Sequence, residues 1–155
     1  MATEIERKFL ITSDAWREGP PGVPICQGYL NLDPERTVRV RLKGEEGFLT
    51  IKGSTSGIGR KEFEYSIPFA DAEALLKMCD PAPLEKIRYE RRHAGKLWEI
   101  DEFGGKNEGL VVAEIELESE DESFEKPAWV GEEVSGDARY YNSSLVEHPW
   151  SEWDD

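Results

Sequence analysis

The chain is dominated by short segments in which apolar and ionic residues alternate one by one. A period of two places successive side chains on opposite faces of a β-strand. Eight such segments can be marked, and they cover residues 3–11, 25–30, 36–43, 47–53, 60–68, 85–93, 96–103 and 110–118. Glycine-containing turns separate several of them, and short turns imply antiparallel neighbours. The sequence therefore predicts a mainly β fold built from antiparallel strands.

Almost every predicted strand has an ionic face, and on several strands this face is sorted by charge. Acidic pairs such as Glu62 and Glu64 share one face of a strand, and Arg39 and Arg41 share one face of another. Like charges two residues apart lie roughly 6.5–7 Å apart and gain nothing from each other. The simpler interpretation is a sheet whose charged face meets water, as in most antiparallel sheets. Sorting by sign instead favours strands that close, so that acidic and basic faces converge on one interior.

Eight strands are about the number that closes around side chains or one small ligand. We therefore expect an eight-stranded antiparallel closed β-barrel with a charged lumen and a few flanking helices, an α+β chain that is mainly β. The inward-facing residues would be six bases and eight acids. They are Lys8, Arg39, Arg41, Lys52, Lys86 and Arg88, and Glu4, Glu6, Glu62, Glu64, Glu99, Asp101, Glu114 and Glu116. Carboxylates suit Mg²⁺ or Mn²⁺, and the bases suit phosphate oxygens, so the lumen suits a metal–polyphosphate complex.

Helices are expected in fewer places than strands. Residues 71–78 combine good helix formers with an aspartate at the start, and Asp80-Pro81 would end the helix. Residues 123–130 and 137–146 are weaker helical candidates.

Length and charge limit the classes of function. A chain of 155 residues suits one domain, residues 1–155, and it contains no apolar run near the roughly 18 residues of a membrane span. Two cysteines without metal-ligand spacing suit reduced thiols, so we expect a cytoplasmic protein. The net charge of −14, which resides in residues 93–155, argues against nucleic acid and membrane as partners. It leaves room for a small anion in a local basic pocket.

The amino-terminal segment Glu4-Ile5-Glu6-Arg7-Lys8 resembles the signature of the CYTH, or triphosphate tunnel metalloenzyme, superfamily. The similarity continues through further strand motifs, Tyr29 and the tail. The motifs are Arg39-Val40-Arg41, Lys52, Glu62-Phe63-Glu64, Lys86-Ile87-Arg88, Glu99-Ile100-Asp101, Glu114-Ile115-Glu116 and Asp137-Ala138-Arg139-Tyr140-Tyr141-Asn142. The resemblance implies an eight-stranded tunnel that hydrolyses or rearranges triphosphates with Mg²⁺ or Mn²⁺. The compact length resembles the branch that acts on inorganic tripolyphosphate, and the carboxy-terminal helix would plug one end of the tunnel.

On this basis each group of residues has an expected role. The metal ligands would be Glu4, Glu6 and Glu116, with Glu114 and Asp101 nearby. The triphosphate would be gripped by Lys8, Arg39, Arg41, Lys52, Lys86 and Arg88. Glu62 or Glu64 would orient the attacking water, and Lys86 is a rival proton acceptor if neighbouring cations lower its pKa.

Several other functions remain open at the level of sequence. A class IV-like adenylyl cyclase would need an adenine pocket, and a thiamine or nucleoside triphosphatase would need an aromatic or apolar subsite. A non-catalytic module that binds polyphosphate or nucleotide would not need the acidic set. A lipocalin-like carrier would need an apolar lumen. The protein is expected to be a monomer or a homodimer.

Overall fold

β-Strands account for most of the chain in the computed structural model, which describes residues 2–56 and 59–153. The strands are β1 (Ala2–Ile11), β2 (Val23–Asn31), β3 (Arg36–Lys43), β4 (Glu46–Ser56), β5 (Gly59–Ile67), β6 (Leu84–His93), β7 (Lys96–Phe103), β8 (Val111–Glu116) and β9 (Val130–Glu133). The α-helices within these described ranges are α1 (Phe69–Leu76) and α2 (Asn142–Glu147). Four 3₁₀ turns accompany them in the same ranges: η1 (Ala15–Arg17), η2 (Gly105–Asn107), η3 (Ala138–Tyr140) and η4 (Trp150–Glu152).

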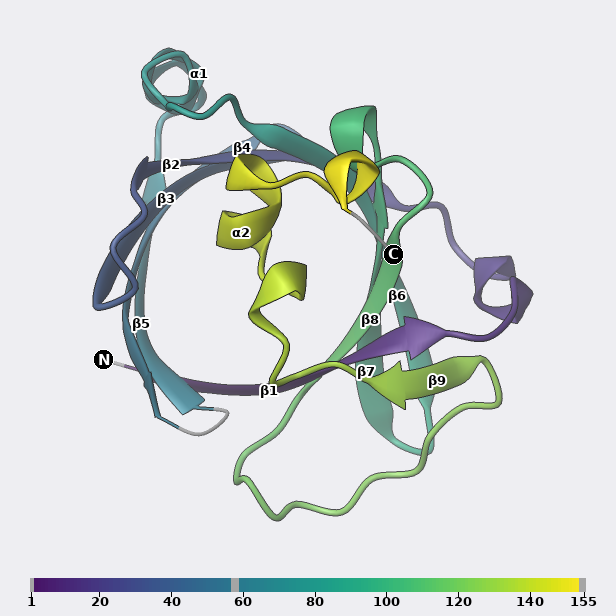
Figure 1. Ribbon diagram of the computed structural model, residues 1–155. Helices are drawn as coiled ribbons and strands as arrows, with labels where there is room; N and C mark the ends of the chain where they lie inside the picture. The colour runs from purple at the N-terminus through teal and green to yellow at the C-terminus, as the bar shows by residue number, and fades with distance from the viewer. Residues whose placement is uncertain (1, 57–58, 154–155) are drawn as a thin grey trace.

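Eight of these strands form a closed antiparallel barrel, as predicted. The order is β5-β4-β3-β2-β6-β7-β8-β1, and β1 also pairs with β5, which closes the ring (Figure 1). The ninth strand, β9, was not predicted. It pairs with the end of β1, where Ile11 lies opposite Val130. The four residues of β9 are too few to show a clear alternation.

The strand register brings the ionic residues to one side of the barrel wall. In an antiparallel pair, residues directly opposite each other point to the same face. Arg39 lies opposite Thr50, which in turn lies opposite Glu64. On the other side of the barrel, Glu114 lies opposite both Lys8 and Glu99. These pairings place the charged set on the inner face, in agreement with the sequence prediction.

The outer face of the barrel is apolar and is covered in two places. Phe9, Trp98, Ile100 and Ile115 pack under the loop that follows β8, which contributes Phe124. On the opposite side, α1 packs on β2, β3 and β4. These two clusters bury much of the outward apolar surface of the strands, whereas some outward side chains, such as Tyr65, stay exposed.

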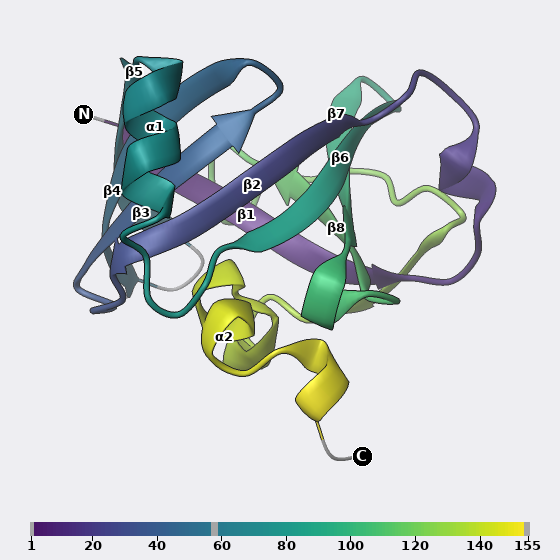
Figure 2. The same cartoon turned by 90° about the horizontal axis from the view of Figure 1, so that it is seen from above.

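A third apolar cluster lies where the barrel meets the carboxy-terminal segment. Leu145 and Val146 of α2 pack with Tyr29, Phe103 and other residues of the wall. Figure 1 shows α2 and η3 within the ring of strands, and Figure 2 shows them at one end of the barrel. The carboxy-terminal segment therefore covers this end, as the family resemblance implied.

The helix predictions had mixed outcomes. The helix expected at residues 71–78 is present as α1, shifted two residues toward the amino terminus. The helix expected at residues 123–130 is wrong: the chain there has no regular structure before β9. Its aromatic residues Phe124 and Trp129 instead pack against Trp98, and Pro127 cannot donate a helical hydrogen bond. Residues 137–146 form η3 and the start of α2, interrupted by the extended Tyr141.

No helix within the described residues is both long enough and apolar enough to cross a membrane.

The outer aromatic cluster predicts a large stability effect. Trp98 is fully buried and contacts the rings of Phe9, Phe124 and Trp129, so Trp98→Ala should cost about 3–5 kcal/mol of unfolding free energy. Urea unfolding measures this cost. The exposed Tyr65 provides a control, because Tyr65→Ala should cost about 1 kcal/mol or less. Equal costs for the two variants would contradict the assignment of this cluster as a core.

Candidate active site

The barrel interior contains a strongly polar cavity of about 190 Å³. Its walls come from β1, β3, β4, β5, β6, β7, β8 and α2. The lining residues are Glu6, Arg39, Arg41, Lys43, Lys52, Glu62, Glu64, Lys86, Arg88, Glu99, Glu114, Glu116 and Asn142. Eleven of the fourteen predicted inward-facing residues are in this set. Lys8 and Asp101 are not in it, and the side chain of Glu4 lies outside the described part of the chain. The sequence prediction that separated strands bring their ionic side chains together is therefore confirmed.

Two arginines of β3 form one wall of the cavity. Arg41 Nη2 lies 3.3 Å from Glu64 Oε1, and Arg39 Nη2 lies 3.7 Å from the same atom. Thr50 Oγ1 donates to that oxygen as well, at 3.1 Å. The buried Nε atoms of Arg39 and Arg41 find no hydrogen-bond partner in the described part of the chain. Buried donors are usually satisfied, so these two are suited to an anionic ligand.

The buried positive charges of the arginine wall repel one another. Burial, helped by the neighbouring Arg39 and Arg88, lowers the pKa of Arg41 to about 10. A bound anion would relieve this repulsion. The arrangement therefore favours a multiply charged anion over a neutral ligand.

The most buried charges of the site form a cluster around Asp101. Asp101 Oδ2 accepts a hydrogen bond from Lys86 Nζ at 2.8 Å. Arg88 donates to both carboxylate oxygens, through Nε at 2.8 Å and Nη2 at 2.9 Å. Although burial opposes ionisation, Arg88 and Lys86 hold the pKa of Asp101 well below its usual range. Burial lowers the pKa of Lys86 to about 8, with Arg88 adding to the effect and Asp101 opposing it.

Asp101 was expected to lie near the metal as a ligand, but its contacts are with cations. Both of its oxygens are engaged by cations, and its side chain does not line the cavity. The geometry favours a carboxylate that fixes Lys86 and Arg88 in place. Its predicted role as a metal ligand remains a prediction.

The acidic wall is formed by β1, β7 and β8. Glu6 lies opposite Glu116 in the strand register, and Glu99 lies opposite Glu114. Glu99 Oε1 lies 3.5 Å from Arg88 Nη1. Glu114 Oε1 lies 3.9 Å from Lys8 Nζ and 4.0 Å from Arg88 Nη2. Burial alone would raise the pKa of Glu114, but Lys8 and Arg88 lower it to about 2, so this carboxylate is ionised at neutral pH.

The chemistry of this wall fits a divalent cation. Carboxylate oxygens are the ligands that Mg²⁺ and Mn²⁺ prefer, and Glu6, Glu114 and Glu116 all line the cavity. Among the described side chains, no three or more His, Cys, Asp or Glu residues are grouped closely enough to hold a metal ion. Glu4 lies opposite Arg60 in the β1–β5 pairing, but its side chain is outside the described part of the chain. The donor types are therefore in place, while the full ligand set remains a prediction.

Lys8 lies at the edge of the site and does not line the cavity. Its Nζ donates to the backbone carbonyl of Tyr140 at 3.2 Å and is 5.7 Å from the ring centre of Tyr141. Burial opposes its charge, but Glu114, Glu6 and Asp101 raise the pKa of Lys8 above its usual value. This ammonium group stabilises the acidic wall, and its contact with substrate stays a prediction.

Two cavity residues were not among the predicted site residues. Lys43 continues the alternation of Arg39 and Arg41 on β3, so its position could have been found from the sequence. Asn142 belongs to α2, in a segment that follows the barrel. A strand alternation cannot show where such a segment returns, and only the motif resemblance of the tail pointed to it.

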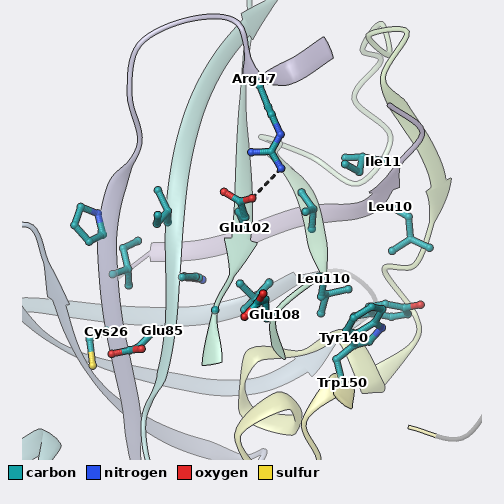
Figure 3. Close-up of a pocket in the computed structure, with 18 of the residues that line it drawn as sticks. Leu10, Ile11, Arg17, Cys26, Glu85, Glu102, Glu108, Leu110, Tyr140 and Trp150 are labelled. Carbon is teal, nitrogen blue, oxygen red and sulfur yellow. Dashed lines mark hydrogen bonds and ion pairs between the residues drawn. The ribbon is translucent and has the colours of Figure 1, made fainter. Parts of the chain in front are cut away.

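A larger cavity of about 1020 Å³ lies elsewhere, along β2, β6 and β7 (Figure 3). Its lining is mainly apolar and includes Leu110 and Trp150, and it contains an ion pair of 2.8 Å between Arg17 and Glu102. Of the predicted site residues, only Lys86 takes part in its described lining. Its mainly apolar chemistry does not match the ionic site, although Lys86 contributes to both linings.

The fold and the site define a class of protein: a closed antiparallel barrel that encloses facing acidic and basic walls. Comparisons with known proteins give the same result. The model of the CYTH domain family matches residues 2–146, and the chain belongs to this family.

Two relatives and one solved structure are similar over nearly the whole chain. The chain is 48% identical to an inorganic triphosphatase of Acetivibrio thermocellus over 151 residues, which is 97% of each protein. It is 39% identical to an inorganic triphosphatase of Nitrosomonas europaea over 149 residues, or 93% of this chain and 97% of the relative. A crystal structure of an inorganic triphosphatase superposes with a TM-score of 0.67 at 37% identity, covering 92% of this chain and 96% of the other.

The low pKa of Glu114 predicts a specific loss of stability in acid. The pKa is 4.5 in the unfolded chain and about 2 in the folded one, so the contribution is complete above pH 4.5 and disappears as pH falls to 2. The shift corresponds to about 3 kcal/mol. Urea unfolding between pH 5 and pH 2.5 should show a weaker pH dependence for Glu114→Gln than for the wild type. The exposed Glu73 of α1 is the control, and a Glu114→Gln slope equal to that of Glu73→Gln would contradict the assignment.

Proposed function

We propose that this protein hydrolyses inorganic triphosphate to pyrophosphate and phosphate with the help of a divalent metal ion, Mg²⁺ or Mn²⁺. One observation carries the proposal: a small interior cavity whose basic and acidic walls face each other. The bases match the oxygens of a polyphosphate, and the acids match the metal ions that accompany it. The names of the two relatives and of the solved structure support the same activity.

The lining of the cavity supports an inorganic substrate over an organic triphosphate. Among the described residues that line it, only Asn142 is uncharged, and none of these residues is aromatic or aliphatic. An adenine or thiamine group would need such a surface for stacking or apolar contact. This observation disfavours the alternatives of a cyclase and of a thiamine or nucleoside triphosphatase. The acidic wall disfavours a module that only binds polyphosphate, because binding alone does not require it.

The bases hold the substrate by complementary means. Arg39 and Arg41 can each present a planar fork to phosphate oxygens, and their unpaired Nε atoms give them spare donors. Lys52 and Lys86 act as point charges on the neighbouring walls, and Arg88 is held by Asp101. Together they orient the phosphate chain along the cavity before reaction.

The acidic residues Glu4, Glu6, Glu114 and Glu116 would hold the metal. A divalent ion held by these residues would supply positive charge that offsets the negative charge developing on the phosphate oxygens during hydrolysis.

Glu62 and Glu64 are the two candidates for the carboxylate that orients the attacking water. Glu64 is already held through its Oε1 atom by Arg39, Arg41 and Thr50, so this carboxylate is less free to turn toward a water molecule. Glu62 pairs with Lys52 at 3.5 Å, its one ion pair within the described ranges. We therefore assign Glu62 the role of orienting the water, ahead of Glu64. Lys86 remains the rival proton acceptor, because its lowered pKa leaves a part of the population neutral near pH 8.

A cytoplasmic location and a monomeric or homodimeric state remain predictions of the sequence.

The activity is tested by supplying tripolyphosphate, ATP and thiamine triphosphate separately, with and without a chelator. Release of phosphate and pyrophosphate from tripolyphosphate, lost with chelator and restored by Mg²⁺ or Mn²⁺, is the expected result. Conversion of ATP to a cyclic nucleotide, or faster cleavage of thiamine triphosphate, would overturn the choice of substrate.

The metal assignment predicts loss of turnover without loss of fold. Glu4→Gln and Glu116→Gln each remove one negative oxygen ligand, so turnover at saturating Mg²⁺ should fall by about 10²-fold or more. The exposed Glu73→Gln on α1 is the matched control and should retain wild-type turnover. Circular dichroism checks the fold. A near-wild-type rate in either of the first two variants would show that the residue does not serve the metal.

The arginine wall predicts a change in KM. Arg39 binds the ground state and the transition state alike in this account, so Arg39→Ala should raise the KM for tripolyphosphate about tenfold or more and alter kcat much less. Steady-state kinetics separates the two constants. An unchanged KM would mean that β3 does not contact the substrate.

A further inference from the structure

The segment after the barrel reaches the ionic cavity from one end. Tyr141 connects η3 to α2. Helix α2 lies within the ring of strands when the barrel is viewed along its axis (Figure 1) and at one end of the barrel from above (Figure 2). Asn142 is the first residue of α2, and it is the residue through which this segment lines the cavity in its described part. A half-buried amide at this position therefore faces charged groups.

Asn142 contacts the most buried lysine of the site. Lys86 Nζ donates to Asn142 Oδ1 at 3.1 Å and to Asp101 Oδ2 at 2.8 Å. A lysine ammonium has three N–H donors, so these two acceptors in the described chain leave one for a ligand in the cavity. Two fixed acceptors also restrict a side chain that otherwise carries much rotamer freedom.

A second lysine of the site is held by the same segment. Lys8 Nζ donates to the backbone carbonyl of Tyr140 at 3.2 Å. The carboxy-terminal segment thus touches ammonium groups from both β1 and β6, which lie on different parts of the barrel wall.

Packing fixes the position of the amide. Three residues beyond Asn142, Leu145 is fully buried, and with Val146 it packs in the cluster that contains Tyr29 and Phe103. The amides of Ser144 and Leu145 both donate to the carbonyl of Tyr141 at 2.9 Å, which anchors the first turn of α2. Asn142 is consequently presented to Lys86 by a rigid element and not by a free terminus.

We propose that Asn142 is a positioning residue of the triphosphate site, whose Oδ1 atom holds the Lys86 ammonium so that its remaining N–H points at the substrate. The inference rests on the proposed function and extends it to a residue outside the barrel strands. It makes the carboxy-terminal segment a functional part of the site as well as a cover for the end of the barrel.

The test is a double-mutant cycle between Asn142 and Lys86. Asn142→Ala removes the acceptor and should raise the KM for tripolyphosphate about tenfold, with kcat changed less than about threefold. Calorimetric binding of tripolyphosphate in the presence of a chelator should weaken by a similar factor. In the Lys86→Met background the same substitution should have almost no effect, because the group that Asn142 positions is absent.

Controls separate positioning from a general loss of structure. Ser143→Ala, one residue further along α2 and outside the cavity lining, should bind and turn over tripolyphosphate like the wild type. Asn142→Leu is a second variant that keeps the side-chain shape without the acceptor, and it serves if Asn142→Ala lowers the thermal midpoint. Additive effects in the cycle, or an Asn142 variant that behaves like Ser143→Ala, would overturn the role of Asn142 and leave the proposed function standing. A wild type that neither binds nor cleaves tripolyphosphate would overturn the proposed function together with this inference.

Discussion

The interaction on which the structure depends is the buried cluster in which Asp101 binds Lys86 and Arg88. Charges removed from water are costly unless they are paired and hydrogen-bonded. Here one carboxylate receives three hydrogen bonds of 2.8–2.9 Å from two cations on the neighbouring strand. The cluster lets the barrel carry cations in its interior while their outer N–H groups remain directed at the cavity. Without Asp101 as a counter-ion, the positive charges of Lys86 and Arg88 would repel each other.

The same arrangement explains why a charged interior is compatible with a stable fold. In this barrel most apolar side chains face outward, where α1 and the loop after β8 cover many of them. At the end that α2 covers, Tyr29 and Phe103 face inward and form a third apolar cluster with this helix. Hydrophobic burial is therefore concentrated around the cavity, and the inner face is left for binding. Replacing buried ion pairs by apolar residues is often neutral or stabilising in proteins. In our account the charged lumen is retained because it binds a metal–triphosphate complex.

Much of this arrangement could be predicted from the sequence, because strand alternation assigns each side chain to a face. The sorting of charge, as in Arg39 and Arg41 on one strand and Glu62 and Glu64 on another, was enough to indicate a closed barrel with an ionic lumen. Pairing partners could not be predicted in the same way. Three contacts depend on tertiary distances that alternation does not give. Cations bind both oxygens of Asp101, two arginines share Glu64, and Asn142 contacts Lys86. The failed helix at residues 123–130 shows the same limit, since aromatic packing against Trp98 outweighed local propensity.

The central claim is that triphosphate and metal meet between the two walls of the interior cavity. A crystal structure of the wild-type protein grown with tripolyphosphate and Mn²⁺ tests it most directly, because anomalous scattering locates the manganese independently of the phosphate. The account predicts phosphate density against Arg39, Arg41 and Lys86, with the manganese peak on the side of Glu6 and Glu116. Phosphate and manganese bound only outside the barrel, for example in the apolar cavity along β2, β6 and β7, would contradict it.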